Sequence, residues 1–339
     1  MGNDGFSSIM ALLVATLVLV IAVFIIFLAS MEHQIIYSNA DNLQAYYLSE
    51  GKIFMALYKD EYYNDQLLPR LETYIKYGRL SPFYDPYIRL KEEDLIEGDK
   101  FNTITTRFYY KNNRNYVDLI TSSNYRGINS EVVARIIILN DLFELGHSII
   151  SRENISGDQM EKYEYFFSHI EENIKIPATG NDILGMEVND YDMINILRDT
   201  NKKMNIEFYR NGMEGPVKSQ VLTKDEIFLL AKNNSSKPVR LTILSEEKAD
   251  NLLLKGIIYI EGDLEILNDF EFHGILILNG GHLYIAPLVN FEVEGIVFMK
   301  DYIQDDSTIH ARYNFDKIIK YGNYLPMFIY PKIELIKSN

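Results

Sequence analysis

The hydrophobic pattern of the chain begins with one uninterrupted apolar run. Ile9 to Ala29 is 21 residues long, carries no charge and contains a single hydroxyl group, that of Thr16. As a helix rising about 1.5 Å per residue it would be roughly 31 Å long, which matches the hydrocarbon core of a bilayer. No later stretch is long and apolar enough to span a membrane again. The sequence therefore predicts one membrane-spanning segment over 9–29, with the bulk of the chain, the residues that follow it, on one side of the bilayer.

After Ala29 the pattern becomes amphipathic, with apolar residues at three- and four-residue steps. The apolar side is expected to contain Ile35, Ile36, Leu43, Tyr46, Tyr47, Ile53, Phe54 and Leu57. The polar side is expected to contain Glu32, Gln34, Asn39, Asp41, Asn42, Gln44, Glu50 and Lys52. Because no proline interrupts residues 6–60, we expect one continuous helix over 6–58. Its first half would lie in lipid and its second half against a globular head.

The region 59–250 has the mixed pattern of an α+β head. Residues 103–110 and 116–121 are β-branched and aromatic and flank a polar turn, which predicts a hairpin. Residues 60–100 are rich in Tyr, Pro and acidic side chains, so we expect loops with short pieces of structure there. Residues 132–145 fit either a strand or a buried helix, because periodicity does not separate the two.

Two helices are predicted further along the head. Apolar residues at helical spacing predict a helix over 158–173. Thr223 followed by Glu226 resembles a capping box and predicts a second helix over 224–232.

A repeat marked by glycine occupies 251–312. Gly256, Gly274 and Gly295 each open a β-branched apolar segment, and they are spaced 18 and 21 residues apart. Repeats of about 20 residues built from short strands and Gly corners suggest a parallel β-solenoid-like stack of rungs. Residues 313–339 are expected to form an extended aromatic segment that caps an open edge or meets a neighbouring subunit. The predicted fold class is therefore α+β, with a long amino-terminal helix, a mixed head and a short-rung β repeat.

Composition narrows the possible functions. The 339 residues include 48 acidic and 33 basic side chains, a formal net charge of −15. Such a surface repels phosphate backbones, so we expect no nucleic-acid partner. Cysteine is absent, which excludes disulfides, thiolate metal sites and a cysteine nucleophile.

No catalytic constellation is visible, so we expect no catalytic residue, cofactor or metal and do not expect an enzyme. The six histidines show no metal-ligand spacing, and neither a phosphate loop nor a GxSxG elbow is present. Residues 189–192 and 304–307 place oxygens close together and could hold calcium, but solvated acidic loops are the favoured interpretation. Gly280 and Gly281 could cradle a phosphate, but neither a helix nor a lysine follows them.

The first residues resemble a known processing signal. Residues 1–5 are a polar leader that ends in Gly5, and Phe6 follows directly and opens the apolar helix. This arrangement resembles the class III signal of type IV pilins, in which a membrane prepilin peptidase cuts after the Gly and methylates the new amino-terminal Phe. The resemblance implies cleavage between Gly5 and Phe6 and methylation of Phe6. It departs from the family at Asp4, where pilin leaders carry basic residues, and at Met10, where major pilins have an assembly Glu. The resemblance thus implies a minor subunit.

Two further segments resemble PilX-type minor pilins. Residues 44–53 match a family motif in kind at Ser49, Glu50, Gly51 and Ile53, whereas Lys52 stands where the family has Gly. The Gly repeat resembles the carboxy-terminal part of the same proteins. The resemblance implies a subunit of a type IV pilus or related filament, first inserted in the cytoplasmic membrane and later displayed at the cell surface. Its implied partners are the prepilin peptidase, other pilin subunits and, before assembly, membrane lipid.

Two other classes of function remain open. A single-pass surface protein that binds a partner or polysaccharide would have the same anchor but would never enter a filament. A membrane-tethered enzyme acting on cell-wall glycans could use paired carboxylates, although no pair can be placed on one site from the sequence.

Overall fold

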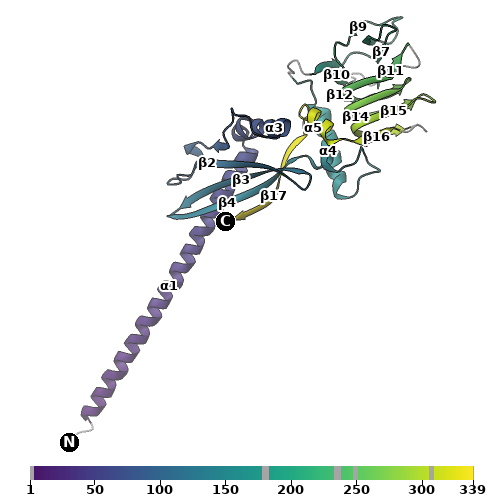
Figure 1. Ribbon diagram of the computed structural model, residues 1–339. Helices are drawn as coiled ribbons and strands as arrows, with labels where there is room; N and C mark the ends of the chain where they lie inside the picture. Colours follow the sequence, from purple (N-terminus) through teal and green to yellow (C-terminus); the bar gives the residue numbers. More distant parts are fainter. Residues whose placement is uncertain (1–3, 178–182, 233–237, 247–250, 305–308, 339) are drawn as a thin grey trace.

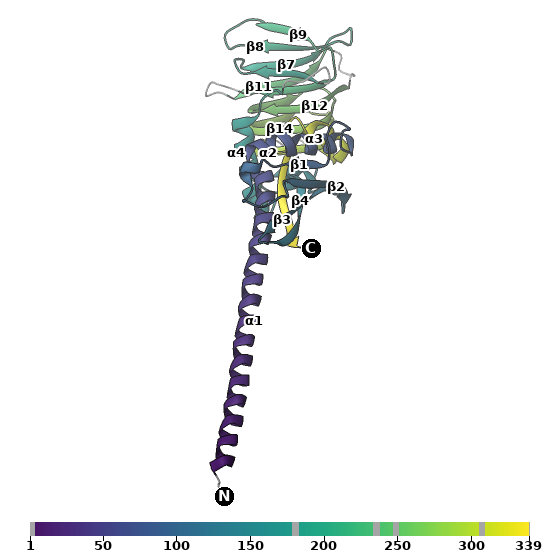
Figure 2. The same ribbon diagram turned by 90° about the vertical axis from the view of Figure 1, so that its left-hand side faces the viewer.

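The computed structural model describes residues 4–177, 183–232, 238–246, 251–304 and 309–338, with 4–8 and 301–304 described by their backbone alone. The chain forms a long helical rod, an antiparallel sheet at the end of the rod and a larger curled sheet beyond it (Figures 1 and 2). The helices are α1 (Asp4–Tyr58), α2 (Asp60–Tyr62), α3 (Leu68–Tyr77), α4 (Asp158–Asn173) and α5 (Phe315–Gly322). Short helical turns are η1 (Tyr63–Leu67), η2 (Glu92–Asp94) and η3 (Asp141–Glu144).

The rod is helix α1, which runs without a break from Asp4 to Tyr58. This confirms one continuous amino-terminal helix, which the absence of proline and the long apolar run predicted. Its last third packs on the first of the two sheets, and its first two thirds project away from the rest of the molecule (Figure 1).

The sheet beside the rod, called here the head sheet, has the strand order β1-β2-β3-β4-β17 with antiparallel pairing throughout. Its strands are β1 (Tyr87–Arg89), β2 (Thr103–Lys111), β3 (Arg114–Tyr125), β4 (Ile128–Leu139) and β17 (Ile329–Ser338). The hairpin β2–β3 confirms the prediction for 103–121. Asn112 and Asn113 take φ values of 50° and 60° at its turn, a conformation that asparagine tolerates in two-residue hairpin loops.

The second sheet, called here the curled sheet, contains twelve strands among the described residues. They are β5 (Ile149–Ser151), β6 (Leu184–Val188), β7 (Met193–Arg198), β8 (Met204–Tyr209), β9 (Lys218–Val221), β10 (Glu226–Ala231), β11 (Val239–Ser245), β12 (Leu252–Ile260), β13 (Gly262–Ile266), β14 (Phe270–Ile285), β15 (Phe291–Gln304) and β16 (His310–Tyr313).

The curled sheet bends because β14 belongs to two columns of parallel strands. Its first half pairs with β12, and the three residues 283–285 at its end pair with β13. The first column continues through β10 and β6, and the second through β11 and β7. The predicted strands of the Gly repeat therefore stack in parallel. The same sheet also includes β5 and the strands β6 to β11, all of which precede residue 251.

The first column is buried on both faces. Successive residues of β12 point alternately into the curl, as Ile258 does, and toward α4, α5 and the head, as Ile257 and Tyr259 do. A strand buried on both faces has an uninterrupted apolar sequence instead of an alternating one. This explains why the repeat segments have several apolar residues in a row.

Three sequence predictions need correction or completion. Residues 224–232 are not a helix, because Phe228, Leu229 and Leu230 of β10 are consecutively buried in the parallel sheet. The ambiguous segment 132–145 is mostly strand β4, followed by η3. Residues 313–339 are not extended throughout, because α5 precedes the edge strand β17. The helix predicted over 158–173 is confirmed as α4.

Candidate functional site

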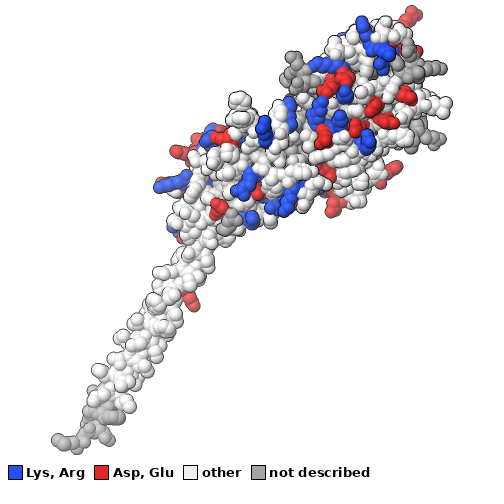
Figure 3. All heavy atoms as spheres, viewed as in Figure 1, with Lys and Arg blue, Asp and Glu red and all other residues white. Residues whose placement is uncertain are grey.

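The exposed part of helix α1 is the most unusual surface of the molecule. From Ile9 to Leu28 its large apolar side chains are between 44% and 70% exposed. The helix passes the length and hydropathy criteria for a membrane span, with a mean hydropathy of 3.3 in its most apolar window and none of that window buried. Figure 3 shows the rod free of charge along most of its length, with the acidic and basic side chains gathered on the head. An apolar surface of this size has to be covered by lipid or by other protein.

The predicted processing site lies at the beginning of α1. Gly5 and Phe6 are helical in their backbone. The side chain of Phe6 lies outside the described part of the chain, as do Met1, Gly2 and Asn3 altogether. A peptidase binds its substrate in an extended form, so the first turn would have to unwind before cleavage. That costs little, because the first four N–H groups of a helix have no partner within it.

Met10 lies on the exposed apolar rod and is 50% exposed. From Gly5 to Met31 the sequence contains no acidic or basic residue at all. The apolar rod therefore carries no carboxylate that could bind the amino terminus of a neighbouring helix.

Small side chains seat the last third of α1 on the head sheet. Ala45, Ser49 and Ala56 are completely buried against it, and the hydroxyl of Ser49 donates a hydrogen bond of 2.8 Å to the carbonyl oxygen of Ser130 in β4. Side chains this small let the helix backbone approach the sheet closely. The last third of α1 is therefore packed directly against the head sheet.

Lys52 strengthens this junction from an unexpected position. It was predicted on the polar side of the helix, but only 2% of it is exposed. Its Nζ lies 2.6 Å from Oδ2 of Asp99 and donates to the carbonyl oxygens of Phe101 at 2.6 Å and Ser122 at 2.8 Å. Burial lowers the pKa of Lys52, and the contact with Asp99 opposes that shift. All three donors of the ammonium group thus tie α1 to the loop before β2 and to β3.

A second apolar face runs along α1 opposite the residues that are buried against the head sheet, and its last member, Tyr58, also borders a groove with Tyr330 of β17. It consists of Ile36, Leu43, Tyr47, Phe54 and Tyr58, which are 66%, 53%, 55%, 39% and 70% exposed. We call these five residues the α1 stripe. They recur at steps of seven and four residues, the spacing of a helix-packing seam. The rings of Phe54 and Tyr58 stack at 6.0 Å between centroids.

From the sequence, the apolar residues of this half-helix are predicted to lie on one side. The structure divides them, because Ile53 is completely buried while its neighbour Phe54 is exposed. Successive residues of a helix point about 100° apart, so a list of apolar positions that includes neighbours describes two faces. Plotting these residues on a helical wheel would have revealed the second, exposed apolar face of α1.

The oxygens of the first candidate calcium loop, 189–192, are only partly used by contacts within the chain, because Oδ1 of Asn189 is buried without a hydrogen-bond partner among the described residues. In the segment 189–192, the Asn189 amide donates to Glu187 at 2.7 Å and Oδ2 of Asp192 accepts from the N–H of Asn211 at 2.8 Å. The segment 304–307 lies almost wholly outside the described residues. Within the described part of the chain, no group of three or more His, Asp or Glu side chains could hold a metal ion.

The glycines considered as a phosphate cradle have a packing role instead. Gly280 and Gly281 turn β14 from one column to the other, with φ values of 78° and 97°. A Cβ on Gly281 would lie 2.2 Å from the carbonyl oxygen of Gly262. The turn is thus filled by the neighbouring strand.

No protein-family model, curated protein or solved structure matches this chain. Its function is therefore inferred from the exposed helix, the junction with the head and the residues at the amino terminus.

Proposed function

We propose that the chain is a minor pilin-like structural subunit of a type IV pilus or related filament. It would be inserted in the cytoplasmic membrane through residues 9–29, cut by a prepilin peptidase between Gly5 and Phe6, and methylated at Phe6. It would then assemble with other pilin subunits through α1, with the acidic head displayed outside the cell. We also interpret the parallel columns of the curled sheet as short coils of a β-solenoid-like domain.

One observation supports this proposal above all others. The apolar surface of α1 does not end where a membrane would end, because the α1 stripe continues to Tyr58, beside the head. A simple anchor needs an apolar surface only within the bilayer. A helix that leaves lipid to pack among other helices needs one along its whole length.

The proposal is tested by the mature amino terminus and by fractionation. Mass spectrometry of the protein from cells with an active prepilin peptidase should give a chain beginning at methylated Phe6. Shearing should release the protein with the filaments. An intact Met1 or Gly2 terminus in those cells would contradict processing, and a chain absent from sheared filaments would contradict assembly.

The second candidate, a membrane-anchored binding protein outside any filament, is favoured by one feature, an open aromatic groove on the head between α4 and β17. In that case the protein would remain with the membrane fraction after shearing. The same fractionation therefore separates the two candidates.

A further inference from the structure

The loop between α3 and β1 presents an aromatic side chain to solvent. Phe83 is 94% exposed at its tip, between Pro82 and Tyr84, and Tyr87 at its end is 42% exposed. We call residues 81–87 the finger. A phenylalanine this exposed on an otherwise well-packed head gains nothing from the fold of its own chain.

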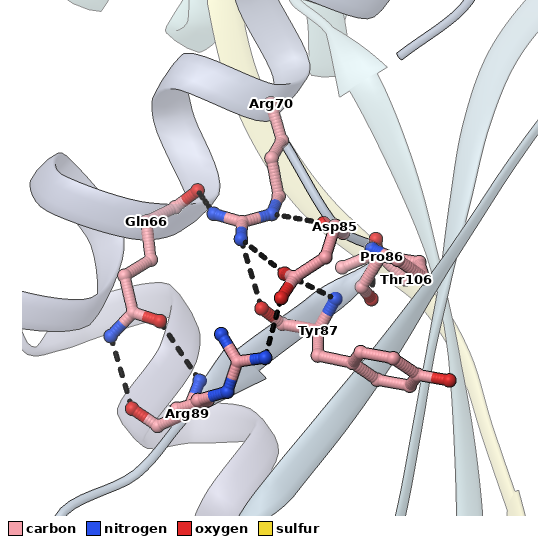
Figure 4. A network of polar contacts seen from close by, with 7 residues as sticks. All are labelled: Gln66, Arg70, Asp85, Pro86, Tyr87, Arg89 and Thr106. Carbon is pink, nitrogen blue, oxygen red and sulfur yellow. Dashed lines mark hydrogen bonds and ion pairs between the residues drawn. The ribbon is translucent and has the colours of Figure 1, made fainter. Parts of the chain in front are cut away.

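The base of the finger is held rigidly by a buried arginine (Figure 4). Arg70 of α3 is 6% exposed, and its guanidinium donates to the backbone carbonyls of Gln66, Asp85 and Tyr87 at 2.5, 3.0 and 2.9 Å. It also donates to Oδ1 of Asp85 at 3.0 Å. On the other side of the base, the carbonyl of Pro86 accepts from the backbone N–H of Thr106 at 2.7 Å.

A rigid base beneath an exposed aromatic tip is the arrangement of a preorganised binding loop. Ordering a loop on binding costs conformational entropy, and a loop already ordered in the free protein avoids that cost. Aromatic side chains are also the usual anchors at the centre of protein interfaces. The finger is thus built to enter an apolar pocket on another molecule.

The same head contains a groove lined by aromatic side chains, which an aromatic side chain such as Phe83 could enter. The groove, of about 570 Å³, opens between the end of α1, helix α4 and strand β17. Three partly exposed tyrosines line it, Tyr58, Tyr165 and Tyr330, together with Met327 and Pro331. Its volume is in the range that accommodates several side chains.

The finger cannot fill the groove of its own chain. The finger leads into β1 and the groove is formed beside β17, and these strands are the two opposite edges of the head sheet. Figure 1 shows β17 and α4 on the side of the head sheet away from β2. A contact between a finger and a groove therefore joins two different molecules and leaves a free finger and a free groove at the two ends.

Each site carries one charged side chain without an ion-pair partner, and the two are of opposite sign. The other charged residues of the groove, Lys162, Lys332 and Asp141, form ion pairs with one another. Arg79 is exposed beside the finger, and Glu161 is exposed at the rim of the groove. Neither side chain forms an ion pair with any residue that the structure describes. Docking the finger would bring an unpaired cation toward an unpaired anion.

We propose that the finger of one copy docks into the Tyr58–Tyr165–Tyr330 groove of a second copy, with Phe83 as the anchor and Arg79 facing Glu161. The biological setting of this contact rests on the proposed function, which it deepens by naming a head-to-head neighbour. Because each head carries both halves of the contact on opposite edges, successive copies form an open row instead of a closed dimer.

Cysteine cross-linking of the full chain tests this contact, since the natural sequence contains no cysteine. Pro82→Cys, which leaves Phe83 in place, is expressed with one tag, and Lys332→Cys at the groove is co-expressed with another. Mild oxidation of membranes should give a mixed disulfide dimer. The matched control pairs Lys332→Cys with Leu288→Cys, because Leu288 is fully exposed in the turn between β14 and β15.

The Pro82–Lys332 pair should cross-link about tenfold more than the control pair, a ratio that reflects a specific contact. Adding Phe83→Ala should remove most of that excess. Arg79→Glu should weaken cross-linking, and Glu161→Arg should restore it in the Arg79→Glu background. Equal yields for the two pairs, or full cross-linking without Phe83, would overturn the proposal.

The outcome is separable from that of the proposed function. Cross-linking with Phe83 dependence in a protein that never appears in sheared filaments would support the contact and reject the filament. A protein found in filaments that gives no excess cross-link would reject the contact alone.

Discussion

The stacked glycines of the curled sheet make the sharpest prediction about stability. Gly256, Gly274 and Gly295 lie opposite one another on β12, β14 and β15. Gly274 has a φ of +149°, and a Cβ placed on it would lie 1.9 Å from the carbonyl oxygen of Gly256. We expect Gly274→Ala to destabilise the protein severely.

The magnitude follows from two separate costs. Forcing a non-glycine residue into this backbone region costs about 1–3 kcal/mol. The Cβ also has to move about 1 Å away from a backbone atom, which loosens about two hydrogen bonds between β12 and β14 at about 1 kcal/mol each. The sum is about 3–5 kcal/mol, a large part of the stability of a typical domain.

Gly280→Ala is the matched control. Gly280 lies on the same strand with a φ of +78°, but a Cβ there would meet nothing within 4 Å. It should therefore cost only the backbone strain, about 1–2 kcal/mol. The difference between the two variants isolates the steric clash.

Urea unfolding of the full chain in detergent micelles would measure this difference. The 25 tyrosines, with no tryptophan, provide a near-ultraviolet circular dichroism signal. If Gly274→Ala does not fold, limited proteolysis should show its curled sheet degraded while Gly280→Ala stays protected. Equal unfolding midpoints for the two variants would refute the reasoning.

Three further predictions concern the head and its junction with α1. Burial raises the pKa of Glu144 to about 7, and Arg114 opposes the rise. The protonated Glu144 carboxyl therefore contributes stability to the folded state that is fully present below about pH 4.5 and is lost as the pH rises through 7. Glu144→Gln should abolish this loss, and the variant should be more stable than the natural protein at pH 8 by up to about 3 kcal/mol. Urea unfolding midpoints measured as a function of pH test this, and a pH profile unchanged by the substitution would contradict the prediction. Lys52→Met leaves Asp99 buried without its cation and should cost about 3–5 kcal/mol, whereas adding Asp99→Asn should recover at least half in the same assay. Gly51→Ala, with nothing within 4 Å of the new Cβ, should raise stability by up to about 1 kcal/mol, and a loss of stability would show that this helical position is constrained.

The pattern of apolar residues in the sequence correctly predicted helices and strands that bury only one face. Helix α4 was predicted over 158–173 from the helical spacing of Met160, Tyr163, Phe166, Phe167 and Ile170. The last four are completely buried, and Met160 is partly buried. The wrong prediction of a helix over 224–232 rested on the resemblance of Thr223 and Glu226 to a capping box, a chance pairing. The residues of β10 are buried on both faces, which removes the alternation that would have marked a strand.

The junction shows what local pattern cannot supply. Lys52 and Asp99 are separated by a turn, several short helices and strand β1, so no sequence spacing connects them. Their proximity is created by the way α1 crosses the head sheet. A hint was present, because Lys52 is seven residues after Ala45 and three after Ser49, on the face that those small residues bury.

The small area of the α1 stripe limits the binding free energy that it can contribute when the protein assembles with other molecules. Its five side chains are roughly half exposed, and burying the remainder would give about 1 kcal/mol each, or about 5 kcal/mol in total. Association of two proteins costs about 4–15 kcal/mol in lost translational and rotational freedom. The stripe outside the membrane therefore barely offsets the cost of one contact. A stable assembly has to add either the membrane-length part of α1, packed against other helices, or contacts between heads such as the one formed by Phe83. If removing Phe83 left the copies associated as tightly as before, the apolar helix alone would have to account for the whole of that free energy.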